Sequence, residues 1–169
     1  MNVTPLAPAS ASTPRRSNPS SLQARLPVAA LALAGLIIAL YLSAVQLHAV
    51  RIPWDPIFGP ASSDRVLHSS ISRMLPVPDA TLGAAGYAAE LIVTLAGGGQ
   101  RWREQPRLVL LYGGIVAGLA VAGILLTAMQ TFVLRSGCTL CLCSAVASVV
   151  AAWLARDEVL ASLSLIRKR

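Results

Sequence analysis

The residues best suited to chemistry are three cysteines in the segment Cys138-Thr139-Leu140-Cys141-Leu142-Cys143, which begins a long apolar run. In a helix, Cys138 and Cys141 lie on neighbouring faces of the first turn, close enough to form a disulfide. The positive end of the helix dipole favours thiolates there, so redox exchange is the leading hypothesis. Packing as small apolar side chains and binding of cuprous ion are the alternatives.

The third cysteine is expected to have a different role from the pair. Cys143 lies about 140° around a helix from Cys138, so we expect it to pack against lipid or a neighbouring helix. Zinc ordinarily needs four ligands, and beyond the cysteines the chain offers only His48 and His68 as soft donors. We therefore predict no metal ligand among the site residues, with a cuprous site built from the three thiols as the alternative.

The elements that must position these thiols are membrane helices. Apolar residues make up 55% of the chain and charged residues 12%, and the charges flank long stretches that contain almost none of them. A helix needs roughly 20 apolar residues to cross the bilayer core. Four segments come near that length: 26–47, 80–96, 108–129 and 138–154. The sequence therefore predicts an all-α integral membrane protein with four transmembrane helices in contact with lipid.

The basic residues predict the orientation of these helices and not a nucleic-acid partner. The net charge is +7, but the arginines flank apolar spans and are not interleaved with aromatic residues on one soluble face. Ten basic residues lie on one side of the predicted membrane and four on the other. The first group is Arg15, Arg16, Arg25, Arg101, Arg103, Arg107, Arg156, Arg167, Lys168 and Arg169, and the second is Arg51, Arg65, Arg73 and Arg135. Both termini are therefore predicted to be cytoplasmic and the cysteine turn extracytoplasmic.

The chain is predicted to have one membrane domain between two tails. Residues 1–24 are rich in Pro, Ser, Thr and Ala, and we expect a disordered cytoplasmic N-terminal tail there. Residues 25–157 form the membrane domain, and residues 158–169 are expected to be a basic cytoplasmic C-terminal tail.

The outer loop from Arg51 to Pro78 is long enough to suggest a function. Its first part, 52–60, contains three prolines and two aromatic residues, which predicts a stiff segment without a helix. Its second part, 62–75, has a serine cap and apolar residues at near-helical spacing. We predict a short amphipathic helix there, lying over the mouth of the bundle.

The second span carries polar and small residues on one stripe. Asp79, Gly83, Gly86 and Glu90 are four, three and four residues apart, with Tyr87 at the edge of the stripe. A carboxylate in hydrocarbon is costly, so the stripe should face the bundle interior. One hypothesis is a ligand pocket in which the glycines leave room for a flat group. The alternative is that Asp79 only caps the helix and Glu90 reaches the inner surface.

The third span contains the small-residue pattern Gly114-x-x-x-Gly118. Such a pair lets another helix approach closely. We expect it to serve packing within the chain and not a dimer.

Taken together, these elements resemble bacterial homologues of vitamin K epoxide reductase. The resemblance rests on Val66-Leu67-x-Ser69, on Pro76-x-Pro78-Asp79-x-x-x-Gly83-x-x-x-Tyr87, and on Cys138-Thr139-Leu140-Cys141 at the start of the last helix. It covers about Leu26 to Leu154, nearly everything but the tails.

The resemblance implies a four-helix bundle in the bacterial cytoplasmic membrane that acts as a thiol:quinone oxidoreductase. By position, Cys141 matches the cysteine next to the quinone, and Cys138 matches the one that exchanges with thiols. Asp79 matches a position that hydrogen-bonds a quinone oxygen, and we expect Gly83 and Tyr87 beside it to line the quinone site. The implied electron acceptor is ubiquinone or menaquinone, and the implied partner is an extracytoplasmic thioredoxin-like or other thiol donor.

The chain departs from this family at two places. Members generally carry a second cysteine pair in the outer loop, whereas this chain has no cysteine before Cys138. Ser63 and the segment Trp54-Asp55-Pro56 stand near the expected positions of that pair, and Ala145 stands where some members have a tyrosine. A second hypothesis is therefore a catalytically degenerate membrane module that acts in assembly or partner binding.

Overall fold

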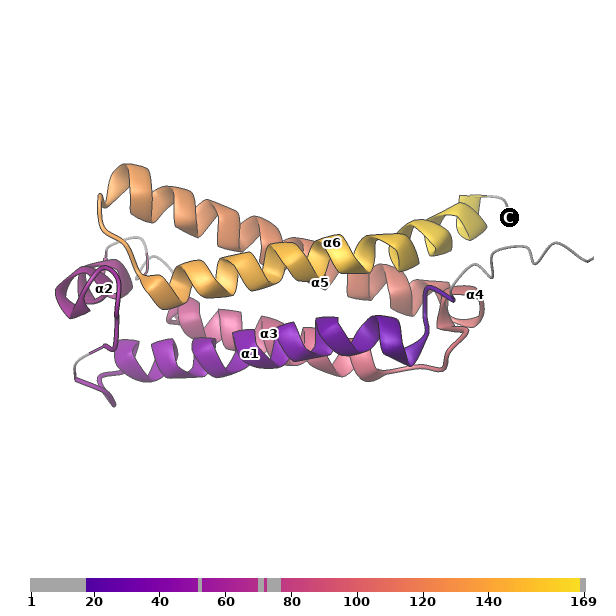
Figure 1. Ribbon diagram of the computed structural model, residues 1–169, viewed down its shortest axis with the longest axis horizontal. Helices are drawn as coiled ribbons and strands as arrows, with labels where there is room; N and C mark the ends of the chain where they lie inside the picture. Colours follow the sequence, from indigo (N-terminus) through magenta and orange to yellow (C-terminus); the bar gives the residue numbers. More distant parts are fainter. Residues whose placement is uncertain (1–17, 52, 70–71, 73–76, 168–169) are drawn as a thin grey trace, which may run out of the picture.

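The computed structural model describes residues 18–51, 53–69, 72 and 77–167, and these residues form helices and connecting loops without a strand (Figure 1). In chain order the helices are α1 (Leu22–Gln46), α2 (Pro60–Leu67), α3 (Asp79–Leu95), α4 (Arg101–Glu104), α5 (Pro106–Ala128) and α6 (Thr139–Arg167). A π-helical turn, η1 (Met129–Val133), continues α5. The prediction of an all-α fold is confirmed for the described residues. Most of the predicted N-terminal tail lies outside them.

The four longer helices lie side by side (Figure 1). Helix α1 packs against α3 and α6, and α5 packs against α6 and α3. Helix α2 lies at one end of the molecule, here called the Cys138 end, and α4 lies at the opposite end, here called the Arg101 end (Figure 1). Three helical segments of the described chain are long and apolar enough to cross a membrane: Leu22–Gln46, Pro106–Val133 and Thr139–Arg167.

Several element boundaries differ from the predictions. The last helix does not end near Leu154 but continues to Arg167, because Glu158 and Ser162 are buried against the rest of the protein. The third span continues past Met129 through the π-helical turn. Helix α2 begins at Pro60, at the first position of a helix that proline favours, and it has no serine cap. It ends at Leu67, while residues 70, 71 and 73–75 of the predicted loop helix lie outside the described residues.

The burial pattern is that of a protein surrounded by lipid. The interior contains many small side chains, among them Ala32, Ala39, Ala120, Ala151 and Ala155. Large apolar side chains on the same helices are exposed, among them Leu33, Ile37, Leu40, Leu111, Ile124, Leu125, Val146 and Trp153. Small residues let helices approach closely inside a membrane, and lipid solvates the large ones. The described helices therefore have the surface of an integral membrane protein.

The expected packing role of Gly114 and Gly118 is wrong for the described structure. A Cβ atom added at either residue would meet no described atom within 4 Å. Other glycines of α5 make the close contacts: a Cβ at Gly113 would lie 2.8 Å from Val159, and one at Gly123 would lie 3.0 Å from the Cα atom of Ala145. The α5–α6 packing therefore uses a different face of the helix from the one that the motif suggested.

Two of the arginines that flank the predicted spans are buried at the Arg101 end. Arg101 has no exposed surface, and its Nε and Nη2 donate to the two carboxylate oxygens of Glu158 at 2.6 and 2.9 Å. Its Nη1 donates to the carbonyl oxygens of Val93, Thr94 and Ala96 at the end of α3. This bidentate pair fastens the α3–α5 connection to α6.

The second buried arginine completes the same cluster. Arg25 of α1 donates from Nη1 to the carbonyl oxygens of Thr94 and Ala96 at 3.1 and 3.0 Å. The last carbonyls of α3 lack partners within their helix, so these two guanidinium groups satisfy them. Ser20 adds a 2.5 Å hydrogen bond from its hydroxyl to Glu158 Oε1. The cluster therefore ties together α1, α3 and α6.

Removing the buried carboxylate is expected to destabilise the fold. Glu158→Gln leaves the buried Arg101 charge uncompensated, and we expect the free energy of unfolding to fall by about 3 kcal/mol. Denaturation of the detergent-solubilised protein, followed by circular dichroism, measures this change. The matched control is Asp157→Asn, because Asp157 is exposed and pairs only at 3.5 Å with Arg156, a contact of little expected value. An equal loss of unfolding free energy in the two variants would contradict a stabilising role of the buried Arg101–Glu158 pair.

Candidate functional site

The two cysteines of the Cys-x-x-Cys motif meet at the start of α6. Cys138 directly precedes the helix, and Leu142 N–H donates to the Cys138 carbonyl at 3.0 Å, which begins the helical hydrogen-bond pattern. The Sγ atoms of Cys138 and Cys141 lie 2.6 Å apart, and both are thiols. Cys138 is 1% exposed and Cys141 is partly buried. The structure therefore brings the predicted dithiol pair together beneath the protein surface.

The surroundings of Cys138 favour its thiolate. The pKa of Cys138 is lowered to about 7, mainly because the Cys141 thiol donates a hydrogen bond to its sulfur. The Ser63 hydroxyl and the Cys141 backbone N–H act in the same direction, while burial and the charge of Asp55 oppose them. Because the thiolate is the reactive form in thiol–disulfide exchange, Cys138 is suited to take part in such exchange near neutral pH.

The third cysteine does not join this pair. Cys143 is exposed on α6. In the described ranges, no three His, Cys, Asp or Glu side chains come together as ligands of a metal ion. The geometry at the helix start is therefore that of a pair of thiols.

Asp55 of the outer loop holds the beginning of α6. Its Oδ2 accepts a hydrogen bond from the Thr139 backbone N–H at 2.9 Å, and its Oδ1 accepts one from the Thr139 hydroxyl at 2.5 Å. The Ser63 hydroxyl donates to Oδ2 at 2.5 Å. A residue distant in sequence thus supplies the side-chain cap that the first turn of α6 needs, next to Cys138.

The Asp55 carboxylate is ionised although it is buried. Burial by itself would raise its pKa, but hydrogen bonds from Ser63, from the hydroxyl and N–H of Thr139 and from the Phe58 N–H outweigh that effect and hold the pKa well below its usual value. A negative charge at a helix N-terminus also interacts favourably with the helix dipole. The Asp55 side chain therefore acts as a permanent anionic clamp between the outer loop and α6.

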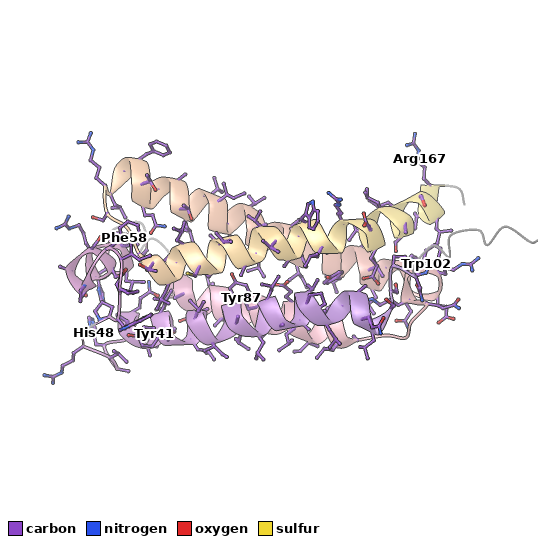
Figure 2. The ribbon with its side chains drawn as sticks, in the orientation of Figure 1. Tyr41, His48, Phe58, Tyr87, Trp102 and Arg167 are labelled. Carbon is purple, nitrogen blue, oxygen red and sulfur yellow. The ribbon has the colours of Figure 1, made fainter. Side chains whose placement is uncertain are left out.

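A second clamp holds the residue before Cys138. The Ser62 hydroxyl donates to the Gly137 carbonyl at 2.8 Å, and the Gly137 N–H donates to the same hydroxyl at 2.9 Å. The Phe58 ring lies against Gly137 so closely that an added Cβ would come within 2.5 Å of it. Phe58 lies at the Cys138 end of the molecule (Figure 2). The loop and α2 therefore cover Cys138.

The sequence analysis placed Asp55 and Ser63 near the expected positions of a cysteine pair. It did not predict that these two side chains hold the start of α6. The only signal was an acidic residue within a stiff, proline-rich segment that precedes a short helix. The contacts with Thr139 cross 84 positions in sequence, so local pattern could not reveal them.

A cavity of about 120 Å³ adjoins the thiols. Its wall includes all three predicted pocket residues of α3, namely Asp79, Gly83 and Tyr87, together with Cys141 of α6. Most of the remaining wall is apolar; it is formed by Ala39, Leu42, Val66, Leu67, Ala80, Leu119, Ala122, Gly123, Leu126, Met129 and Leu134, with Ser69, Ser72, Thr127, Gln130 and Ser144. Sequence reasoning therefore identified residues that share one cavity.

Asp79 is the first residue of α3 and lines the cavity. Helix α3 begins at this residue, and its Oδ1 accepts a hydrogen bond from the Ala80 N–H at 2.9 Å. The same oxygen accepts hydrogen bonds from the Ser72 hydroxyl at 2.6 Å and from the Gln46 amide. The alternative in which Asp79 only caps the helix is wrong, because Pro78 holds the cap position and no side chain caps α3.

Tyr87 closes the cavity toward the middle of the bundle (Figure 2). Its hydroxyl donates to the Ser144 carbonyl at 2.8 Å and lies 2.6 Å from the Ser148 hydroxyl, which links α3 to α6. Its ring fills the space left by Gly35 of α1, where an added Cβ would lie 2.4 Å from the ring.

The other residues of the α3 stripe have different roles. A Cβ atom at Gly83 would meet only Ala39, at 3.9 Å, so Gly83 leaves open space in the cavity wall. Gly86 instead packs against Leu119, where a Cβ would come within 2.8 Å. The alternative in which Glu90 reaches the inner surface is wrong, because Glu90 is 1% exposed.

Gln130 is a cavity residue that sequence reasoning missed. It lies in the π-helical turn η1 and is buried, and its Oε1 has no hydrogen-bond partner among the described residues. π-helical turns occur frequently at functional sites. The sequence feature that could have identified it is a polar glutamine at the end of an apolar span. An unpartnered amide in the cavity wall is suited to bind a polar group of a ligand.

The site can therefore place an electron acceptor next to a dithiol. An apolar cavity with a few polar groups fits a flat, apolar molecule that carries hydrogen-bonding oxygens. Asp79, Tyr87 and Gln130 supply those polar groups, and Cys141 lies in the same wall.

Loss of the Asp55 clamp is expected to expose Cys138. In Asp55→Ala the first turn of α6 loses its cap, and we expect maleimide to label Cys138 about tenfold faster, in line with the free energy of a helix cap. Mass spectrometry after timed labelling identifies the cysteine that reacts. Asp64→Ala is the matched control, because Asp64 is exposed on the neighbouring helix α2 and should leave the rate unchanged. An unchanged labelling rate in Asp55→Ala would contradict the clamp.

Comparison with known proteins agrees with this geometry. No curated protein matches the sequence. The family model described as "Vitamin K epoxide reductase family" matches residues 26–156, which include the outer loop, the cavity and both cysteines of the pair. This family comprises membrane oxidoreductases that act on thiols and disulfides and are linked to quinones. With its apolar helices, its dithiol and this match over most of its length, the chain belongs to the vitamin K epoxide reductase family.

Proposed function

We propose that this protein is a membrane thiol:quinone oxidoreductase that couples disulfide formation in extracytoplasmic thiols to quinone reduction. One observation carries the proposal: Cys141 lies in the wall of a cavity and touches Cys138, which the outer loop covers. A dithiol can thus receive electrons from one side and pass them to an acceptor on the other. The catalytic residues are Cys138 and Cys141.

The cavity fits the head group of a ubiquinone or menaquinone. A quinone supplies an acceptor of two electrons and two protons. Asp79 and Tyr87 contribute polar groups on one helix, Gly83 leaves space between them, and Gln130 presents an unpartnered amide oxygen. The apolar remainder of the wall suits the ring and the start of the isoprenoid tail.

The proposed topology has four transmembrane helices with both termini in the cytoplasm. Helix α3 is the fourth span: its 17 residues extend about 26 Å, near the thickness of the bilayer core, and it packs against α1 and α5. Helix α2 then lies in the extracytoplasmic loop as a short amphipathic helix. The excess of basic residues at the Arg101 end supports this orientation. The family resemblance favours the bacterial cytoplasmic membrane.

The proposed cycle uses the two cysteines in sequence. Oxidation of their thiols forms one S–S bond and releases two electrons and two protons. A donor dithiol then attacks the disulfide at Cys138, becomes oxidised itself and returns both cysteines to thiols. Because the chain has no cysteine before Cys138, the donor must reach Cys138 directly. A thioredoxin-like protein or another extracytoplasmic thiol is the proposed donor.

The second candidate is a catalytically degenerate module that acts in assembly or partner binding. The observation that favours it is the hydrogen-bonded pair of Asp55 and Ser63 in the outer loop, where the resemblance leads one to expect a cysteine pair. Under this hypothesis Cys138→Ser and Cys141→Ser leave the cellular phenotype unchanged. Substitutions that break helix packing, such as Gly113→Leu, abolish it.

Quinone reduction by the purified protein tests the leading proposal. With a reduced thioredoxin-like protein as donor, we expect the absorbance of a short-tailed ubiquinone or of a menaquinone analogue to change with turnover. Cys138→Ala and Cys141→Ala should reduce the rate to background, because neither variant can form the disulfide. Cys143→Ala is the matched control and should keep the rate. Wild-type protein that consumes neither quinone, or a Cys141→Ala variant as fast as wild type, would refute the proposal.

Substitution of Gln130 tests the quinone site separately from thiol exchange. In Gln130→Leu the cavity loses a polar group, and we expect the KM for quinone to rise about tenfold, in line with the loss of one buried hydrogen bond. Exchange of the cysteine pair with a donor disulfide should be unchanged. Thr131→Val, at the exposed neighbouring position, should keep the wild-type KM. A Gln130→Leu variant with an unchanged KM would show that the quinone does not contact this amide.

A further inference from the structure

Glu90 is a buried carboxyl group that thiol oxidation does not use. It lies on α3 and is 1% exposed. Within the part of the chain that the structure describes, no hydrogen-bond partner reaches its Oε1. An ionised carboxylate in an apolar interior costs several kcal/mol unless it is paired, so this group carries a proton in the resting protein.

Glu90 lies one helical turn beyond the cavity. Tyr87, three residues earlier on α3, lines the cavity wall, and side chains at this spacing are neighbours on one helix face. The Tyr87 hydroxyl is 2.6 Å from that of Ser148, and Tyr87 lies near the middle of the bundle (Figure 2). Two hydroxyl groups that can carry protons therefore lie at the end of the cavity nearer to Glu90, on the side away from the thiols.

The Arg101 end is the nearer end of the bundle for Glu90. Glu90 lies five positions before Leu95, the last residue of α3, which corresponds to about 7.5 Å along the helix axis. Eleven residues separate it from Asp79 at the other end, about 16 Å. A path between Glu90 and the Cys138 end would also have to pass through the cavity itself.

Polar side chains continue from Glu90 toward the Arg101 end. The Thr94 hydroxyl donates to the Glu90 carbonyl at 2.6 Å, and Tyr112 of α5 lies near both residues. The charged groups beyond them are Arg25, Arg101 and Glu158.

We propose that Glu90 supplies protons to the cavity from the Arg101 end. This inference rests on the proposed function. The Glu90 carboxyl gives its proton toward the cavity through Tyr87 and Ser148, and it is protonated again from the Arg101 end, which the proposed topology places in the cytoplasm.

The proposal makes the reaction vectorial. Oxidation of the two thiols releases two electrons and two protons, and conversion of a quinone to a quinol takes up two of each. The thiol protons leave at the Cys138 end, while the two protons of the quinol come through Glu90. Each turnover therefore consumes two protons on one side of the membrane and releases two on the other.

The choice of residue distinguishes this role from simple packing. A glutamine would fill nearly the same space with an uncharged polar group, but its amide has no acidic proton to give. A structural role predicts that Glu90→Gln behaves like wild type, whereas proton supply predicts that it does not.

Proteoliposomes with a pH-sensitive dye in the lumen test the proposal. A membrane-impermeant reduced thioredoxin-like protein is added outside, with a short-tailed ubiquinone in the bilayer, so that only molecules with Cys138 facing outward turn over. Valinomycin and potassium remove the membrane potential. We expect the lumen to lose two protons for each quinone reduced, and a protonophore to abolish the pH change.

Two variants locate the effect at Glu90. Glu90→Gln should lower both turnover and lumen alkalinisation about 100-fold, a typical contribution of a proton-transfer group, while Glu90→Asp retains part of both. Glu104→Gln, at an exposed acid of α4, is the matched control and should resemble wild type. Infrared spectra of the resting protein without quinone should show a protonated carboxylic acid band that is lost in Glu90→Gln.

The outcomes separate this proposal from the one on which it rests. Wild-type turnover without a pH change in the lumen would place proton uptake at the Cys138 end and overturn the role of Glu90, while the oxidoreductase assignment stands. Normal lumen alkalinisation in Glu90→Gln, or no loss of the infrared band, would also overturn it. Wild-type protein without any quinone reduction would remove both proposals.

Discussion

The position of the dithiol pair depends on the interaction between the Asp55 carboxylate and the start of α6. The first backbone N–H groups of a helix have no hydrogen-bond partner within that helix. Another part of the chain must supply acceptors for them. Asp55 accepts hydrogen bonds from the Thr139 N–H and hydroxyl, and Ser63 holds the carboxylate in place. The position and burial of Cys138 follow from this contact between two distant parts of the chain.

The polar groups inside the bundle are of two kinds. Those of Arg101 and Glu158 bind one another and the carbonyls at the end of α3, so they close the Arg101 end of the structure. Glu90 Oε1 and Gln130 Oε1 have no partner among the described residues. A buried polar atom without a hydrogen-bond partner is unfavourable in an apolar interior. Such an atom therefore marks a site where a bound ligand or a proton can supply the missing interaction. Gln130 lies in the wall of the cavity that Cys141 also lines, and Glu90 lies one helical turn beyond this cavity.

The outer loop shows how this member of the family differs from the pattern that its sequence resembles. Near the positions where the resemblance leads one to expect a cysteine pair, Asp55 and Ser63 form a hydrogen bond that cannot carry electrons. The same two side chains instead fix the helix start and act on Cys138. The loop therefore contacts the site through polar side chains, and the proposed electron path runs from an external thiol directly to Cys138.

The sequence by itself determined the membrane helices, the dithiol and much of the cavity. Hydropathy is a local property, so the start of each of the four long helices could be located to within a few residues. The spacing of Asp79, Gly83 and Tyr87 was enough to place them on one face. Cys138 and Cys141 are close for the same reason, since one helical turn joins them. These features need only the period of a helix.

Tertiary structure decided which polar residues are partnered and by what. Arg25 and Arg101 have the same local context as solvated flanking arginines, yet they are buried because α3 ends with free carbonyls beside them. The end of α6 at Arg167, the clamp at Asp55 and the burial of Glu90 and Gln130 likewise depend on contacts between segments far apart in sequence. Local pattern cannot encode such contacts, because which side chains meet across the bundle is set by how the helices rotate and pack against one another.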